Sequence, residues 1–251
     1  MSGNDRLEEF EIDCYEVADT AFEVPVRAFL RRIDLGYVYD ELLRPTLEEG
    51  SALVALAVRR RPWPPWGIGA RTVSAMAIAT SVSDATAGLT GVLVAPEEAT
   101  SIGLLAASHH TLLDGLQARG VEMAHHVIKE GSEFGERLAA AAGFERTSSL
   151  ILSEDARYWL HAADIARHRE ALGIDGEDVD RLISGEALDD ETLDRVSLYL
   201  LGISRAIDPW WREQVRAGEV IANTGPGRVA ECLPPGGPPP KKLGQEQELV
   251  D

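Results

Sequence analysis

The stretch that decides the fold is GVLVAPEEATSIGLL, residues 91–105. An apolar run up to Val94 predicts a buried strand, and an apolar periodicity that starts after Ser101 predicts a helix. A strand, a short turn and a helix N-terminus form the junction at which many α/β proteins hold a phosphate, because the free N–H groups of the first helical turn point at the ligand. Here the turn carries Glu97 and Glu98 and no basic residue. The junction therefore has the shape of an anion site without the matching charge.

Strands and helices alternate on both sides of this junction. Alternating or continuous apolar patterns predict strands at 10–17, 51–58, 71–82, 89–94, 121–128 and 144–152, the last of which closes the series. Amphipathic patterns predict helices from about Val24, within 37–50, and at 101–119 and 132–142. This order is typical of an α/β fold with a mixed sheet flanked by helices.

The chain after Ser153 reads as an all-helical extension. Helices are expected at 154–173, 176–184, 189–207 and 210–218. The Pro- and Gly-rich segment after Leu233 has the composition of a flexible tail. We therefore expect an α/β domain at 1–153, a helical C-terminal module at 154–232 and a tail at 233–251.

The net charge of the chain excludes some classes of binding partner. The 251 residues carry a formal net charge of −18 and a pI near 4.7, so the chain repels nucleic acids and anionic membranes. The two cysteines form no metal-binding spacing, and no apolar run reaches the ~18 residues of a membrane span. We expect a cytoplasmic protein, or a virion-associated one if a phage encodes it, with no nucleic-acid or membrane partner.

Residues 10–152 resemble the GNAT acyltransferase superfamily. Val94 and Pro96 match the V-x-P strand end of that family, Gly103 matches the last glycine of its turn, and Gly143–Phe144 match its closing GF. The resemblance implies a GNAT-like mixed sheet and an acyl-CoA donor.

In that family, backbone N–H groups at the helix start hold the pyrophosphate of acyl-CoA, usually with a basic side chain nearby. The resemblance places these groups at Ser101, Ile102 and Gly103. The turn of this chain has lost a glycine and gained Glu97 and Glu98. A carboxylate ~6 Å from a phosphate costs about 1 kcal/mol at the effective dielectric of a protein surface. That cost offsets the roughly 0.3–1 kcal/mol that a helix end contributes.

The family's proton donor is also missing. Counting back from Gly143, the tyrosine that commonly protonates the leaving thiolate is Ala139, the asparagine is Ser132, and Gly135 replaces an alanine. These losses together predict a GNAT-like domain that has no cofactor and no acyltransferase activity.

Two functions follow from this reading. In the first, the chain is a non-catalytic binding or structural protein that contacts a protein partner or forms a homo-oligomer, for example a virion component or a toxin–antitoxin or regulatory element. Its expected contact residues are Trp63, Trp66, Trp210 and Trp211, although for the loop of the first two a hairpin folded back onto its own sheet is the favoured interpretation. In the alternative, the chain is an acyl-CoA-dependent N-acyltransferase with a divergent donor site, and His125 or His126 acts as the base.

Residues 109–115, HHTLLDG, match the HHxxxDG motif of condensation domains, which would make His110 a base and Asp114 a structural residue. The motif falls inside a predicted helix, so we favour a half-buried His109 and an exposed His110. His125 and His126 follow each other on a strand and face opposite ways, so they cannot chelate one metal together. No spacing predicts a metal site.

Residues 174–207 resemble the later helices of Cro/Xre-type helix-turn-helix domains and the toxin-binding domain of certain antitoxins. The shared features are SGE, a leucine-rich helix and LLGI. A DNA-reading surface should be basic, whereas this one is acidic, so the resemblance favours protein binding. A plain helical extension explains the pattern equally well.

Overall fold

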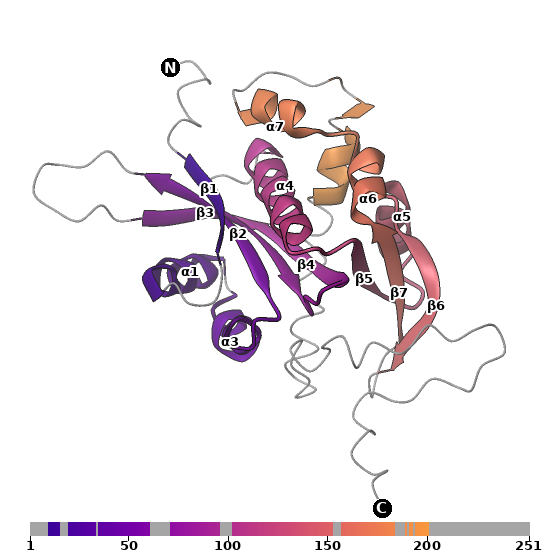
Figure 1. Ribbon diagram of the computed structural model, residues 1–251, viewed down its shortest axis with the longest axis horizontal. Coiled ribbons are helices and arrows are strands. Elements are labelled where there is room, and N and C mark those ends of the chain that lie inside the picture. Colours follow the sequence, from indigo (N-terminus) through magenta and orange to yellow (C-terminus); the bar gives the residue numbers. More distant parts are fainter. Residues whose placement is uncertain are drawn as a thin grey trace, which may run out of the picture.

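A mixed seven-stranded sheet forms the centre of the molecule, with the strand order β1-β2-β3-β4-β5-β7-β6 (Figure 1). The computed structural model describes residues 10–15, 20–33, 35–60, 71–95, 102–152, 157–183, 189, 191–192 and 194–200. The strands are β1 Phe10–Tyr15, β2 Leu53–Arg60, β3 Arg71–Thr80, β4 Thr86–Val94, β5 Met123–Lys129, β6 Glu145–Leu152 and β7 Arg157–Asp164. The mixed α/β sheet flanked by helices is therefore confirmed.

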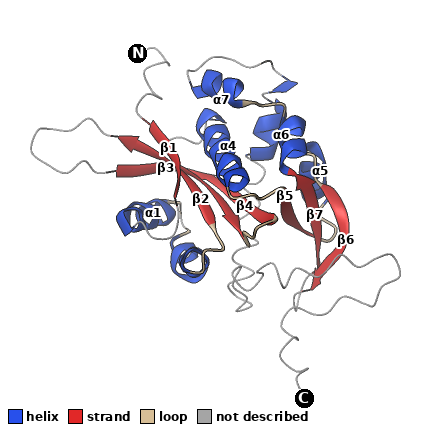
Figure 2. Cartoon of the chain, in the orientation of Figure 1, coloured by secondary structure: helices blue, strands red, loops and turns tan. Residues whose placement is uncertain are grey.

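Helices cover both faces of this sheet (Figure 2). They are α1 Thr20–Arg32, α2 Gly36–Val38, the π-helical turn η2 Tyr39–Leu43, α3 Arg44–Glu48, α4 Ile102–Ala118, α5 Glu133–Ala141, α6 Ile165–Leu172 and α7 Gly176–Ile183. Residues 194–200 are also helical, and we call them the C-terminal segment.

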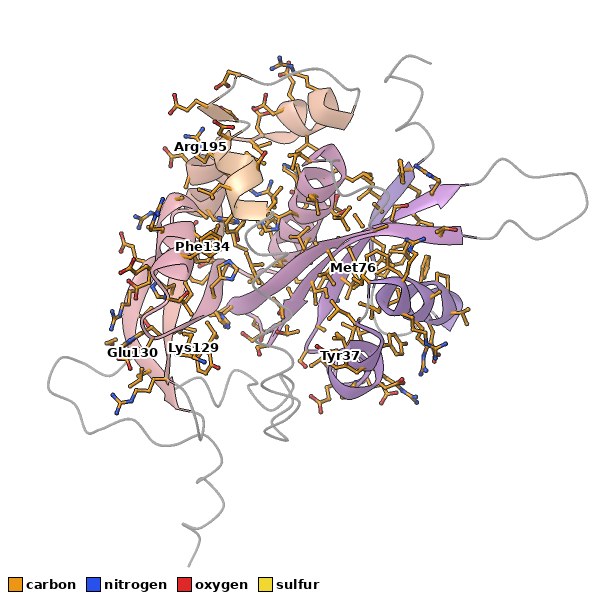
Figure 3. The ribbon with its side chains drawn as sticks, turned by 180° about the vertical axis from the view of Figure 1, so that it is seen from behind. Tyr37, Met76, Lys129, Glu130, Phe134 and Arg195 are labelled. Carbon is orange, nitrogen blue, oxygen red and sulfur yellow. The ribbon has the colours of Figure 1, made fainter. Side chains whose placement is uncertain are left out.

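Successive side chains of β2 enter two different buried cores, which explains why its sequence is continuously apolar. Val54 and Leu56 pack with the core under α1, α2 and α3, whereas Leu53 and Ala55 pack with the core under α4. Met76 of β3 belongs to the first of these cores (Figure 3). Because both faces are buried, neither face of the strand can carry polar side chains.

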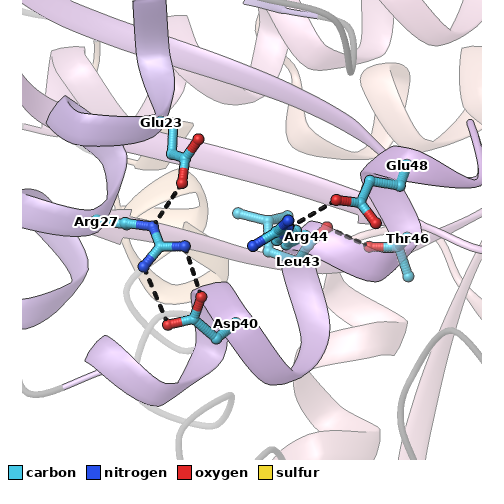
Figure 4. A network of polar contacts seen from close by, with 7 residues as sticks. All are labelled: Glu23, Arg27, Asp40, Leu43, Arg44, Thr46 and Glu48. Atoms are coloured by element: carbon cyan, nitrogen blue, oxygen red, sulfur yellow. Dashed lines mark hydrogen bonds and ion pairs between the residues drawn. The ribbon is translucent and has the colours of Figure 1, made fainter. Parts of the chain in front are cut away.

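Arg27 ties α1 to the π-helical turn (Figure 4). Its guanidinium lies 2.7 Å from Asp40 and 3.0 Å from Glu23, and it stacks 4.5 Å from the ring centre of Tyr39. Partly exposed pairs of this kind contribute at most about 1 kcal/mol each. The buried Thr46 hydroxyl, which donates to the Leu43 carbonyl, holds the start of α3 within the fold.

The helix expected at 154–173 is wrong in its first half. Arg157–Asp164 form β7, which pairs antiparallel with β5 on one side and β6 on the other. The local composition favours a helix, but two ladders of backbone hydrogen bonds override this weak preference. The strand expected to close the sheet, β6, therefore lies at the edge and is followed by another strand. The sheet extends past residue 153, where the sequence places the end of the α/β domain.

Of the segment expected to be a helix, 154–173, only the part from Ile165 is helical. The Asp164 side chain caps α6 by accepting the Ala166 N–H, and Gly173 ends the helix in the left-handed conformation. The helix expected at 176–184 is confirmed as α7, and parts of the one expected at 189–207 appear at 191–192 and 194–200. The last expected helix and the tail lie outside the described residues.

In the part of the chain that the structure describes, we find no helix long and apolar enough to cross a membrane.

Candidate functional site

The parallel contact between β4 and β5 is short. Only three pairs join the strands, and they end at Gly88 and His125. Beyond this point β4 continues to Val94 beside β3, and β5 continues to Lys129 beside β7. The two strands therefore separate, and we call the place where they part the β4–β5 opening.

A bulge in β4 lies next to this opening. The register of β3 and β4 shifts so that Ile78 faces Gly91 and Ala79 faces Leu89, which leaves Thr90 as the additional residue. The Thr90 hydroxyl lies 2.7 Å from that of Thr80. Bulges bend a strand and change the direction of its groups, and they are common beside functional sites.

Two side chains of the protein itself meet at the opening. His126 follows the last β4–β5 pair directly, and its Nε2 lies 2.8 Å from the hydroxyl of Tyr199. The same imidazole also hydrogen-bonds the backbone of Leu89 in β4. Tyr199 comes from the C-terminal segment and is only 1% exposed. The His126 imidazole thus reaches from β5 toward β4 at the opening, and its hydrogen-bond partner Tyr199 lies far along the chain.

These two residues belong to a larger buried group, the histidine–tyrosine cluster, made of His109, His126, Phe144, His168 and Tyr199. His168 Nδ1 lies 2.8 Å from the Ala142 carbonyl oxygen, so this nitrogen carries the proton and donates. Its Nε2 then accepts from His109 Nε2, at 2.9 Å. That leaves Nδ1 of His109 as a buried acceptor with no hydrogen-bond partner among the described residues.

Arg195, labelled in Figure 3, fixes the C-terminal segment against the end of α6. Its Nε donates to the Leu172 carbonyl at the end of α6, at 3.2 Å, and its guanidinium lies against Gly173. Val196 and Leu200 of the same segment are buried in the core with Tyr199. The segment is therefore an integral part of the core under α4.

Burial keeps the cluster uncharged. It lowers the pKa of His126 to about 3 and that of His168 to about 4, and it holds the pKa of His109 well below its ordinary value. Burial also raises the pKa of Tyr199 well above 10. At neutral pH every member is neutral, which suits a hydrogen-bonded core and makes His126 a weak base.

His125 lies on the opposite face of β5, as the strand pattern predicts. It packs against Gly88, where a side-chain Cβ would lie 3.0 Å from the His125 Nε2 and 3.2 Å from the Thr80 carbonyl oxygen. Burial lowers the pKa of His125 to about 4. No group of three or more potential metal-ligating side chains occurs in the described residues.

No protein-family model and no curated protein sequence matches the chain. Among solved structures, a putative GNAT-family acetyltransferase from Desulfovibrio desulfuricans matches 62% of this chain and 99% of its own, with 14% identity and a TM-score of 0.43. The ribosomal-protein-S18-alanine N-acetyltransferase of Escherichia coli matches 62% and 94%, with 18% identity and a TM-score of 0.37. A spermidine/spermine N-acetyltransferase from Vibrio cholerae matches 65% and 96%, with 8% identity and a TM-score of 0.41. At these identities and TM-scores the likenesses carry no argument about the fold family or the activity of this chain.

The junction at which the sequence resemblance places an acyl-CoA donor is described only in part. Ile102 and Gly103 form the first turn of α4, as expected, and Gly103 is buried. Ser101, Glu97 and Glu98 lie outside the described residues. The first two turns of α4, up to His109, contain neither lysine nor arginine.

The residues that replace the second GNAT motif have structural roles. Ser132 caps α5 by accepting the Gly135 N–H at 3.1 Å. Gly135 packs so closely that a Cβ there would lie 2.8 Å from a methyl carbon of Ile128. Ala139, at the tyrosine position, is 2% exposed within the core that also holds Tyr199. This region is thus occupied by a helix cap and apolar packing.

The HHxxxDG stretch lies within α4, as expected. His109 is buried rather than half-buried, and His110 is half-buried rather than exposed, because Arg169 of α6 covers it. Nδ1 of His110 lies 3.1 Å from Asp114 Oδ2, and Arg169 contacts both residues.

The four tryptophans named as contact residues, Trp63, Trp66, Trp210 and Trp211, lie outside the described residues. Sequence reasoning missed His168 and Tyr199. Tyr199 stands three residues after Val196 in the helix expected at 189–207, and this spacing was the available signal. His168 had no comparable signal.

Proposed function

We propose that this chain is a non-catalytic GNAT-like protein that acts through protein–protein contacts. The observation that carries the proposal is the closure of the β4–β5 opening by the His126–Tyr199 pair. A thioester-bearing arm that entered between the strands would have to displace the buried Tyr199 ring and break its hydrogen bond. The described residues of the opening therefore do not fit acyl-CoA, and we propose no cofactor.

The chain also lacks the proton donor and the general base that acyl transfer requires. Ala139 has no proton to donate to a leaving thiolate. The pKa values of His125 and His126, about 4 and about 3, make both imidazoles poor bases near neutral pH, where a general base works best with a pKa close to the working pH. Both features support a binding role.

The partner in this proposal is a protein with basic patches, or a second copy of the chain. A net charge of −18 steers basic surfaces toward the molecule and repels nucleic acids. Trp63, Trp66, Trp210 and Trp211 remain the proposed contact residues. A virion component, a toxin–antitoxin element and a cytoplasmic regulatory factor are all consistent with this role.

Calorimetric titration with acetyl-CoA tests the proposal. The protein should give no binding heat, and acetyl-CoA should not raise its melting temperature, because the chain itself fills the opening. Sub-millimolar binding by the unaltered protein would overturn the proposal.

Variants distinguish two obstacles to acyl-CoA binding, namely the carboxylates of Glu97 and Glu98 and the ring of Tyr199. The E97R/E98G variant removes the expected repulsion of the diphosphate, and adding Y199A removes the ring from the opening. We expect the triple variant to bind acetyl-CoA more tightly than either the double variant or the parent. The E48R/E49G variant has the same charge change on α3 and should not bind. If the triple variant binds no better than the parent, the account of both obstacles is wrong.

A divergent N-acyltransferase is the second candidate. The separation of β4 and β5 beside the Thr90 bulge favours it, because separated strand edges can hydrogen-bond an extended amide-containing arm. The same titration decides between the two: binding by the parent protein supports this candidate, and release of free coenzyme A with a primary amine would establish it.

A further inference from the structure

Tyr199 of the C-terminal segment has ring contacts with all four other members of the histidine–tyrosine cluster. Its ring centre lies 5.0 Å from that of His168, 5.6 Å from that of His109 and 5.9 Å from that of His126. These three histidines come from α6, α4 and β5, which Figure 1 labels. One short segment therefore covers buried histidines from three other elements, and water would reach all three if the segment left.

The hydrogen bonds of the cluster disfavour an added proton. His109 and His168 face each other through their Nε2 atoms at 2.9 Å, so a proton on His168 Nε2 would meet the N–H of His109. Nδ1 of His109 is buried without a hydrogen-bond partner among the described residues, so a proton there would lack an acceptor. His126 donates to the Leu89 backbone and accepts from the Tyr199 hydroxyl, and a proton on its Nε2 would break the second bond. Since a buried charge without a partner is costly, the packed cluster requires neutral rings.

The charges around the cluster act in the same direction. Burial is the main cause of the low pKa values of the three rings, and Arg169 and the neighbouring histidines add to it, against the backbone hydrogen bonds to Leu89 and Ala142. The groups that act on the rings from the packed elements are His110 of α4, His125 of β5, His161 of β7 and Arg169 of α6, while α5 and β6 contribute the apolar Leu138, Ala139 and Phe144 and the segment itself carries Arg195. The titratable groups among these are neutral or positive, so they offer a protonated ring no counter-charge.

Polar contacts tie the C-terminal segment to other elements at two points in the described structure. One is the bond between Tyr199 and His126, and the other runs from Arg195 Nε to the Leu172 carbonyl oxygen at 3.2 Å. The remaining attachment is the apolar packing of the segment's buried side chains. The segment is not a strand, so its departure leaves the backbone ladders of the seven-stranded sheet intact. It can therefore leave as a local unit without unfolding the sheet.

We propose that mildly acidic pH releases the C-terminal segment from the core while the seven-stranded sheet stays folded. The released state takes up protons at the three histidines and the packed state does not, so a falling pH favours release. Release also uncovers the apolar core that Val196, Tyr199 and Leu200 cover. This device does not rest on the proposed function, because it needs neither acyl-CoA nor a protein partner.

Hydrogen exchange of the full chain, measured by mass spectrometry at pH 7 and pH 5 and corrected for the intrinsic exchange rate, tests the proposal. The strand β3, which pairs with β2 and β4, is the reference for global unfolding. A histidine with an ordinary pKa near 6.5 that gains its proton on release should lower the protection of residues 194–200 about twentyfold between these pH values. We expect a fall of at least about twentyfold in the segment, with β3 better protected than the segment at both pH values. An unchanged segment, or equal protection of the segment and β3, contradicts the proposal.

Two variants assign the response to the cluster. H168N keeps a side-chain N–H for the Ala142 carbonyl oxygen but removes a titrating ring, so its segment should lose about twentyfold less protection than that of the parent. H125M removes a buried histidine from the opposite face of β5 and should leave the response of the segment unchanged. If the two variants change the response equally, the segment follows the stability of the whole fold and the proposal fails. The comparison of the segment with β3 in the parent decides the question even if a variant does not fold.

Discussion

Tyr199 lies at the β4–β5 opening and also packs in the core, so a substitution there changes the stability of the fold. Its ring stacks near Phe144, with the planes inclined by 19°, and its hydroxyl pairs with His126. A buried hydroxyl of this kind requires a partner, and so does the imidazole nitrogen opposite it. The residue that closes the opening is therefore expected to stabilise the folded state measurably.

Two substitutions separate the ring from the hydroxyl. The Y199F variant leaves Nε2 of His126 buried without its partner and should lower the free energy of unfolding by about 1–2 kcal/mol. The Y199A variant also leaves a cavity and should lower it by about 3–5 kcal/mol. Urea denaturation measures both. Leu198, which is 46% exposed on the same segment, is the control, and L198A should cost under about 1 kcal/mol. Equal losses for Y199A and L198A would mean that the segment does not pack on the cluster.

At the scale of elements, the turn from α5 to β6 is fixed by a glycine with two constraints. Gly143 has a φ of +81°, and a Cβ there would lie 2.9 Å from the Ala171 Cβ and 3.2 Å from the Arg167 carbonyl oxygen. Gly131, before α5, has a φ of +80° and nothing within 4 Å of its would-be Cβ. Comparing substitutions at the two glycines therefore separates the cost of steric contact from the cost of a left-handed backbone.

We expect G131A to lower the free energy of unfolding by about 1–2 kcal/mol, which is the cost of a left-handed conformation for a residue with a Cβ. G143A should cost clearly more, because its Cβ also pushes α6 away from the turn. Parallel urea titrations of the two variants measure the difference. Equal losses would show that α6 yields without cost.

Local sequence patterns predicted those helices and strands in which the spacing of the apolar residues matches the residues that are buried. The apolar run of β2 and the apolar periodicity that begins after Ser101 are examples, and the GF at 143–144 correctly marked the end of α5. They did not predict β7, whose strand form depends on two neighbouring strands rather than on its own composition. For the same reason the cluster was only partly predictable: His168 lies 59 residues from its partner His109, and Tyr199 lies 73 residues from His126. Such pairings are decided by the tertiary fold.

At the scale of the whole molecule, the chain combines a strongly acidic composition with buried neutral histidines. Carboxylates give the net charge of −18, and aspartate and glutamate in model peptides titrate near 4. Histidine in an unfolded chain titrates near 6.5. Between these limits the buried histidines dominate the pH dependence of stability, because the charge of the carboxylates hardly changes there.

The sign of that dependence follows from the direction of the pKa shifts. Burial lowers the pKa of His125 to about 4, of His126 to about 3 and of His168 to about 4. The unfolded chain therefore binds more protons than the folded one below pH ~6.5, so stability is full above that pH and falls as the pH drops toward 4.

Each such histidine contributes a slope of up to about 1.4 kcal/mol per pH unit. Urea denaturation at a series of pH values between 6.5 and 5 measures the total slope. His125 is the residue to replace, since burial alone lowers its pKa. The H125M variant should reduce the slope by about one proton's worth, whereas H110N, which changes a half-buried ring, should reduce it less. An unchanged slope in H125M would mean that His125 takes up its proton in the folded protein as readily as in the unfolded chain, and β5 would then have to open to water at that position.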